Sequence, residues 1–226
     1  MKILKNFLSV MLLAVAAYFP LTSQAVPTQV DLELVLAVDV SGSVDGTEYA
    51  GQKNGYIAAF NDAAIQSAIT SGALGKIAVT YVEWSGSTQQ SQLIGWTLID
   101  DAASSSAFAT AIGNTSRAFS GLTGVGSAID YSTGLFSFND PASAQYVGDR
   151  KVIDVSGDGT NNSGVAPSTA RDAALAAGVT TINGIAIQTA SLEGYYRDNV
   201  IGGPNAFATF ANNFEDDFSK AIKDKL

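Results

Sequence analysis

The sequence predicts an α/β fold, a doubly wound, mostly parallel six-stranded sheet with helices on both faces and one antiparallel edge strand. Short apolar runs alternate with segments whose apolar residues recur at helical spacing, which is typical of parallel strands joined by crossover helices. The first run, residues 32–39, is apolar on both faces, as expected of a strand that helices cover on each side. With 226 residues and no linker composition, we expect a single domain over residues 26–226.

The other elements follow in chain order. Apolar residues at helical spacing predict a helix over residues 47–69, and residues 76–84 form the second strand. Only a short turn separates this strand from residues 92–99, so the third strand is expected to be antiparallel and to lie at an edge. The later expected helices are 100–119, 126–136, 167–177 and 214–226, and the later strands are 151–156, 179–187 and 206–211.

The first 25 residues have the layout of a secretory signal peptide. Lys2 and Lys5 precede an apolar stretch, residues 7–19, that is too short to span a bilayer, and Ala25 is a small residue at the expected cleavage site. The alternative is a buried N-terminal helix, which the lysines and Pro20 disfavour. We therefore predict export to the periplasm or the extracellular medium, and no membrane insertion after cleavage.

Composition excludes several classes of function. The net charge of −9 becomes −11 when Lys2 and Lys5 are removed, which argues against nucleic acid and anionic membranes as partners. The chain has no cysteine and no histidine, so it has no disulfide, no thiolate chemistry, no Ser-His-Asp relay and no zinc site of the ordinary type. On this ground we do not expect an enzyme.

Hard oxygen ligands follow the first predicted strand. Asp39, Ser41 and Ser43 form the pattern Asp-x-Ser-x-Ser on one tight turn, and this chemistry suits Mg²⁺, Mn²⁺ or Ca²⁺ better than Zn²⁺. Taken alone, the pattern is also typical of a turn or a helix N-cap. The interpretation as a metal site therefore depends on further ligands.

Two more loops should reach the same edge of the sheet. Asp158 follows the fourth strand, and the carboxyl ends of neighbouring parallel strands meet where the strand order reverses. The antiparallel third strand runs away from that edge and the next helix returns, so residues 120–126 lie there too, with Thr123 as their hydroxyl. A plain flexible turn is the alternative for Thr123, and Asn161 and Asn162 are interpreted as turn residues. Five ligands would leave one position of an octahedral shell for water or a partner's oxygen.

At these residues the chain resembles the von Willebrand factor A (vWA) fold, including the integrin inserted domains. The metal-ion-dependent adhesion site (MIDAS) of that family is matched, residue by residue, by Asp39, Ser41, Ser43, Thr123 and Asp158. Within the superfamily, the motifs Val152-Ile-Asp-Val-Ser-Gly-Asp-Gly and Tyr195-Tyr-Arg-Asp-Asn-Val-Ile-Gly-Gly are similar to those of a group of bacterial secreted proteins of unknown function. The resemblance covers the mature chain. It implies a secreted adhesion-type module that binds Mg²⁺, or else Mn²⁺ or Ca²⁺, with an Asp or Glu of a protein partner completing the shell.

Two other functions stay open. One is a metal-assisted hydrolase, whose general base would have to be Glu83, Asp154 or Asp45 because histidine is absent. The other is a structural metal that ties three loops together. Asp154 also departs from the apolar fourth strand of the vWA family, and we expect its buried carboxylate to be hydrogen-bonded internally or, as the alternative, to support the metal ligands.

Two aromatic segments admit two interpretations each. Trp84 at the predicted hairpin is either a core residue or an exposed partner contact. Tyr195, Tyr196 and Arg197 either form a contact surface or belong to a helix that packs on the sheet.

Overall fold

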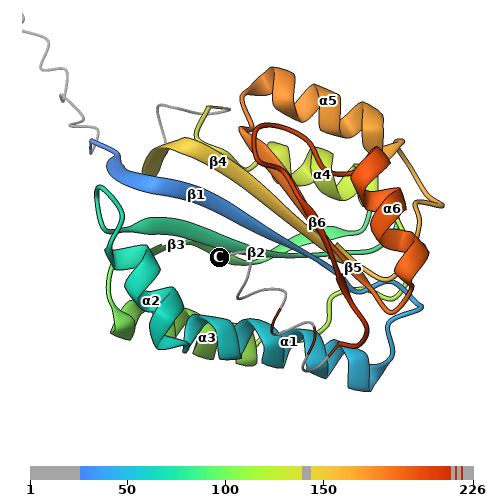
Figure 1. Cartoon of the computed structure of the whole chain (residues 1–226), viewed down its shortest axis with the longest axis horizontal. Helices are drawn as coiled ribbons and strands as arrows, with labels where there is room; N and C mark the ends of the chain where they lie inside the picture. The colour runs from blue at the N-terminus through green and yellow to red at the C-terminus, as the bar shows by residue number, and fades with distance from the viewer. Residues whose placement is uncertain (1–25, 139–143, 215–216, 218–219, 221–226) are drawn as a thin grey trace, which may run out of the picture.

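The computed structural model describes residues 26–138 and 144–214, together with Asp217 and Lys220 (Figure 1). The predicted signal peptide and most of the predicted helix 214–226 lie outside these residues, so both stay predictions. Within the described part of the chain, none of the helices combines the length and the apolar character needed to cross a membrane.

A six-stranded sheet in the order β3-β2-β1-β4-β5-β6 forms the centre of the molecule. Its strands are β1 (Thr28–Asp39), β2 (Ile77–Trp84), β3 (Gln90–Ile99), β4 (Tyr146–Gly157), β5 (Thr181–Ile187) and β6 (Ala208–Ala211). Neighbouring strands pair in parallel except β2 and β3, which are antiparallel. The predicted fold class, with its one antiparallel edge strand, is confirmed.

Helices cover both faces of the sheet (Figure 1). One face carries α1 (Gly46–Phe60), α2 (Ala63–Thr70) and α3 (Ala102–Gly113), and the other carries α4 (Val125–Thr133), α5 (Pro167–Ala177) and α6 (Ala190–Asn199). Successive side chains of a strand point to opposite faces. In β1, Leu34 and Leu36 therefore pack in the core under α1–α3, whereas Val35 and Ala37 pack in the core under α4–α6. This double burial explains why the strand is apolar throughout.

The prediction of one helix over residues 47–69 was wrong. Two helices occupy this segment, because Asn61 ends α1 and Asp62 begins α2 as its N-cap. The Asp62 side chain accepts a hydrogen bond of 2.9 Å from the Ala64 N–H, which satisfies one of the free donors at a helix start. Apolar spacing continues across the break, so periodicity alone does not detect it.

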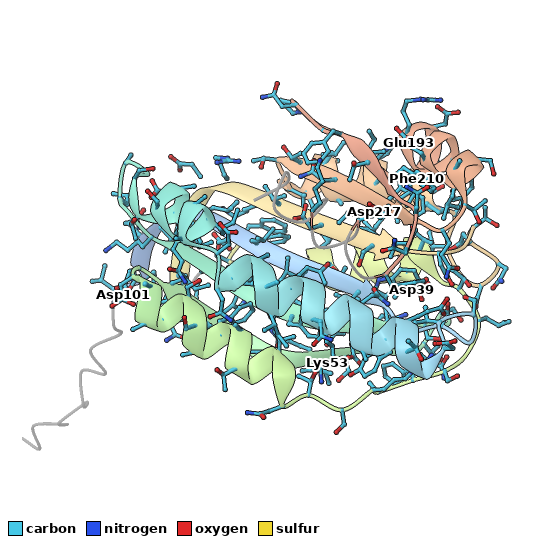
Figure 2. All side chains as sticks on the ribbon, turned by 60° about the horizontal axis from the view of Figure 1, so that its bottom comes forward. Asp39, Lys53, Asp101, Glu193, Phe210 and Asp217 are labelled. Carbon is cyan, nitrogen blue, oxygen red and sulfur yellow. The ribbon has the colours of Figure 1, made fainter. Side chains whose placement is uncertain are left out.

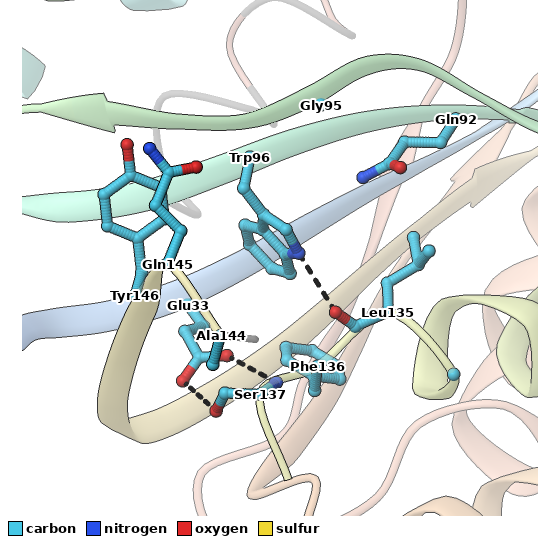
Figure 3. A pocket seen from close by; sticks show the side chains of 11 residues that line it. Glu33, Gln92, Gly95, Trp96, Leu135, Phe136, Ser137, Ala144, Gln145 and Tyr146 are labelled. Atoms are coloured by element: carbon cyan, nitrogen blue, oxygen red, sulfur yellow. Dashed lines mark hydrogen bonds between the residues drawn. The ribbon is translucent and has the colours of Figure 1, made fainter. Parts of the chain in front are cut away.

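A cavity of about 320 Å³ lies between β3, the segment after α4 and the start of β4 (Figure 3). The buried Glu33 lines it, and its carboxylate accepts hydrogen bonds from the Ser137 hydroxyl and the Gly148 N–H, each of 2.8 Å. Lys151 Nζ lies 3.3 Å from the same carboxylate. The buried charge is therefore paired and hydrogen-bonded, as burial requires. None of the five candidate metal ligands lines this cavity.

Candidate metal centre

The three loops that carry the candidate ligands meet at the carboxyl edge of the sheet. Asp39 ends β1 there (Figure 2), and the Gly42 N–H in the following turn donates a hydrogen bond of 2.8 Å to the Gly121 carbonyl. The loop after β4 joins them, since the Ser43 hydroxyl donates to Asp158 Oδ1 over 2.8 Å. Segments far apart in the sequence therefore come together as strand direction predicted.

Four of the five candidate ligands form a continuous chain of contacts. The Ser41 N–H donates to Asp39 Oδ1 over 2.7 Å, which fixes the carboxylate against its own turn. The Ser41 and Ser43 hydroxyls lie 3.1 Å apart, and Ser43 then reaches Asp158. Two carboxylates and two hydroxyls thus share one small volume.

Thr123 lies beside this chain. Its side chain is buried, and a Cβ added to Gly159, the residue after Asp158, would lie 3.4 Å from Thr123 Oγ1. Asn162 fixes the position of Thr123: its Oδ1 accepts from the Thr123 N–H and its own N–H donates to the Thr123 carbonyl, both over 2.9 Å. Asn162 was expected to be only a turn residue, and its role depends on a pairing between loops that local sequence does not reveal.

The electrostatics of the centre suit a divalent cation. Asp39 is fully buried, and within the described residues its Oδ2 has no hydrogen-bond partner. Burial raises the pKa of Asp39 to about 7, and the neighbouring charge of Asp158 contributes in the same direction. Burial also raises the pKa of Asp158. A divalent cation between these carboxylates would favour the ionised form of both.

The donor set fits a hard cation that prefers oxygen. Over the described ranges, no three or more acidic, His or Cys side chains are placed to hold a metal ion. A cation at this edge would therefore need the hydroxyls of Ser41, Ser43 and Thr123 in addition to the two carboxylates. Neutral oxygens together with one or two carboxylates are typical ligands of Mg²⁺ and Ca²⁺.

Two residues that the sequence did not point to hold the backbone of the first turn. Arg117 Nη2 donates to the carbonyls of Val40 and Ser41, over 2.9 and 2.7 Å. Gln52 Nε2 donates to the Asp39 carbonyl over 2.9 Å. Neither residue belongs to a motif. Both act on backbone atoms across the fold, and a single sequence carries no signal for such contacts.

The three candidate general bases are engaged elsewhere. Glu83 accepts from the Tyr49 hydroxyl over 2.8 Å, and Asp45 caps helix α1 through the first N–H groups of that helix. The buried Asp154 accepts from Asn183 Nδ2 over 3.1 Å, so its expected internal hydrogen bond is confirmed. Each of these carboxylates therefore accepts at least one hydrogen bond within the protein.

For both aromatic segments, the structure supports the interpretation that they pack on the sheet. Trp84 is fully buried in the core under α4–α6, so it is not an exposed contact. Tyr196 lies on α6 and is fully buried in the same core. The Tyr195 hydroxyl accepts from the Asn161 N–H over 3.1 Å, which ties α6 to the loop after β4. Arg197 is exposed and pairs with its neighbour Asp198.

Solved structures with this fold include adhesion and matrix proteins. Proximal thread matrix protein 1 from the mussel byssus is 16% identical with a TM-score of 0.63, over 88% of this chain and 49% of that one. A further structure of the mussel protein has zinc in its MIDAS motif. The pilus adhesin SpaC from Lactobacillus rhamnosus GG is 14% identical with a TM-score of 0.59, over 88% of this chain and 31% of that one. The present chain thus spans about half of the first protein and about a third of the second.

A single vWA domain matches over nearly its full length. The VWA domain of SpRpn10 is 13% identical with a TM-score of 0.57, over 85% of this chain and 94% of that domain. Identities this low establish the fold alone. Among curated protein sequences, none matches this chain. A family model does match residues 29–226, and the chain, whose fold is that of vWA domains, therefore belongs to the family of proteins of unknown function called DUF1194.

Proposed function

We propose that this protein is an exported binding module whose contact with a protein partner depends on a divalent cation. Asp39, Ser41, Ser43, Thr123 and Asp158 would hold the ion, Mg²⁺ first and Mn²⁺ or Ca²⁺ as substitutes. An Asp or Glu of the partner would complete the shell. The observation that carries the proposal is the buried Asp39 Oδ2, which lacks a hydrogen-bond partner among the described residues while its carboxylate lies beside that of Asp158.

A bound cation would neutralise the negative charge of the two carboxylates at this centre. A buried carboxylate without a partner is costly, and a second carboxylate nearby increases the cost. A bound divalent cation supplies the positive charge that both groups lack, and it leaves an open position for an anionic oxygen. The zinc-occupied MIDAS of the mussel protein supports a cation at this place in the fold. The all-oxygen donor set of the present chain favours Mg²⁺ over Zn²⁺.

The surface beside the centre supports a protein as the partner. Four large apolar side chains are exposed among the described residues, and two of them belong to loops that carry candidate ligands. Leu122 precedes Thr123 and is 61% exposed, and Val165 in the loop after β4 is 38% exposed. Apolar surface next to a charged position is typical of protein interfaces, where an apolar patch surrounds a few specific polar contacts. The SpaC neighbour, a pilus adhesin, is consistent with an adhesive role.

The proposal includes that the chain is not an enzyme. Its support is that Glu83, Asp45 and Asp154 accept hydrogen bonds from other groups and are not among the residues whose contacts join Asp39 to Asp158. Metal-dependent hydrolysis of ester or phosphoester substrates by the purified protein, lost in Asp39→Ala, would overturn this part.

Calorimetric titration with Mg²⁺, Mn²⁺ and Ca²⁺ tests the cation. The wild type should bind and Asp39→Ala should not, while Asp172→Ala, which removes an exposed acid on α5, should bind as the wild type does. Absence of binding by the wild type, or equal binding by Asp39→Ala, would contradict the proposal.

Capture of cell-envelope proteins on the immobilised chain tests the partner. Binding should require the cation, should be reversed by chelator and should be lost in Asp39→Ala. Cation-linked stabilisation without any such capture would instead support a purely structural metal.

A further inference from the structure

Two buried oxygens without a partner lie at the same place in the fold. One is Asp39 Oδ2, and the other is the hydroxyl of Tyr196 on α6. Both residues are fully buried, and within the described part of the chain neither atom has a hydrogen-bond partner. Buried polar atoms are nearly always paired, so two unpaired ones at a single site call for an explanation.

Gly157 at the end of β4 separates these oxygens. A Cβ added there would lie 2.6 Å from the Tyr196 hydroxyl and 2.8 Å from Asp39 Oδ2. Both atoms therefore border the space that the missing side chain of Gly157 leaves open. The Cβ of any other residue at this position would push the two oxygens apart. Glycine is therefore favoured at position 157 for lack of space, whatever its backbone angles.

A second glycine makes room for the tyrosine ring. A Cβ on Gly184 of β5 would lie 2.6 Å from Tyr196 Cδ1. The ring thus packs directly on the backbone of β5, while the hydroxyl extends over β4 towards Asp39. Two glycines on neighbouring strands, Gly157 and Gly184, leave the space that the Tyr196 side chain fills. In this position the Tyr196 hydroxyl points towards the candidate metal centre.

Packing alone does not require the hydroxyl. Phenylalanine has the same ring and would fill the core without burying an unpaired polar atom. A phenol has a pKa of about 10, so near neutral pH the group is a hydrogen-bond donor. Asp39 Oδ2, which has no donor among the described residues, borders the same space beside Gly157 and can accept from the Tyr196 hydroxyl. Groups that hydrogen-bond to metal ligands orient them and tune metal affinity.

We propose that Tyr196 is a positioning residue of the cation site, whose hydroxyl donates to the Asp39 carboxylate and orients it when the cation is bound. The inference rests on the proposed function, since it assigns a role towards the same ion. It makes α6 part of the site, although no residue of that helix belongs to the MIDAS-like motif.

The test compares Tyr196→Phe with a matched control, Tyr81→Phe. Tyr81 is also fully buried, its hydroxyl has no hydrogen-bond partner in the ranges that the structure describes, and its ring packs edge-on against Tyr56 in the opposite core. Calorimetry should show the Kd for Mg²⁺ raised about 10–100-fold in Tyr196→Phe and unchanged in Tyr81→Phe. The metal-free Tm of Tyr196→Phe should equal or exceed that of the wild type, because the variant removes an unpaired buried hydroxyl.

The opposite pattern overturns the inference. A lowered metal-free Tm with unchanged affinity, or failure of Tyr196→Phe to fold, would show that the hydroxyl is structural. The electron paramagnetic resonance spectrum of bound Mn²⁺ gives a second readout, and it should differ between the wild type and Tyr196→Phe but not between the wild type and Tyr81→Phe. If the wild type binds no cation, the proposed function and the inference both fail. If it binds and Tyr196→Phe binds equally, only the inference fails.

Discussion

Asp39 should make the stability of the metal-free protein depend on pH in a direction that is unusual for an acid. Its pKa is raised from 3.8 to about 7 in the folded state, so between these values the folded protein binds a proton that the unfolded chain has released. The free energy of unfolding should therefore be higher near pH 4 and fall as the pH rises towards 7. In Asp39→Asn, which keeps an acceptor for the Ser41 N–H but cannot ionise, the part of this fall that Asp39 causes should be absent.

The size of the effect follows from the shift. One pKa unit corresponds to about 1.4 kcal/mol, so the wild type should lose about 3–4 kcal/mol relative to Asp39→Asn over this range. Urea unfolding in the presence of chelator, followed by the fluorescence of the buried Trp84, measures it. Saturating Mg²⁺ should remove the loss in the wild type, because the ion stabilises the carboxylate. Equal pH dependence of wild type and Asp39→Asn in chelator would refute the electrostatic account of the centre.

Three further substitutions test the parts around the ligands. Arg117→Ala removes the hydrogen bonds to the carbonyls of Val40 and Ser41. Urea unfolding should then show a free energy of unfolding lower by about 1–3 kcal/mol, and calorimetry a weaker affinity for Mg²⁺. Unchanged affinity would show that these bonds are irrelevant to the site. Asn162→Ala removes the acceptor of the Thr123 N–H, and we expect a similar loss of stability with a higher Kd for Mg²⁺, whereas normal binding would remove Thr123 from the ligand set. Leu122→Ser should leave Mg²⁺ titrations unchanged while weakening capture of the partner, and unchanged capture would exclude this surface from the contact.

The sheet and the meeting of the loops were predictable because they follow from direction and burial. A strand that is apolar on both faces requires helices on both sides, and one short hairpin sets the direction of every later segment. Those two facts bring Thr123 and Asp158 to the edge where Asp39 ends β1. Neither depends on the detailed conformation of a side chain.

What the sequence did not predict depends on contacts between side chains and distant backbone. Arg117, Gln52 and Asn162 act on carbonyl and N–H groups of other segments, and no local spacing indicates such bonds. The sequence identified Tyr196 only as an aromatic residue, because its packing against Gly157 and Gly184 exists only once β4, β5 and α6 are assembled. The break at Asp62 was missed for the opposite reason, since a local cap overrides an apolar period that continues past it.

The most direct test of the cation site is a crystal structure of the protein grown with Mn²⁺, with anomalous scattering used to locate the ion. The expected result is a single strong anomalous peak at the carboxyl edge of the sheet, within coordination distance of the candidate oxygens of Asp39, Ser41, Ser43, Thr123 and Asp158. An anomalous map with no peak there, from crystals in which the three loops are ordered, would contradict the account.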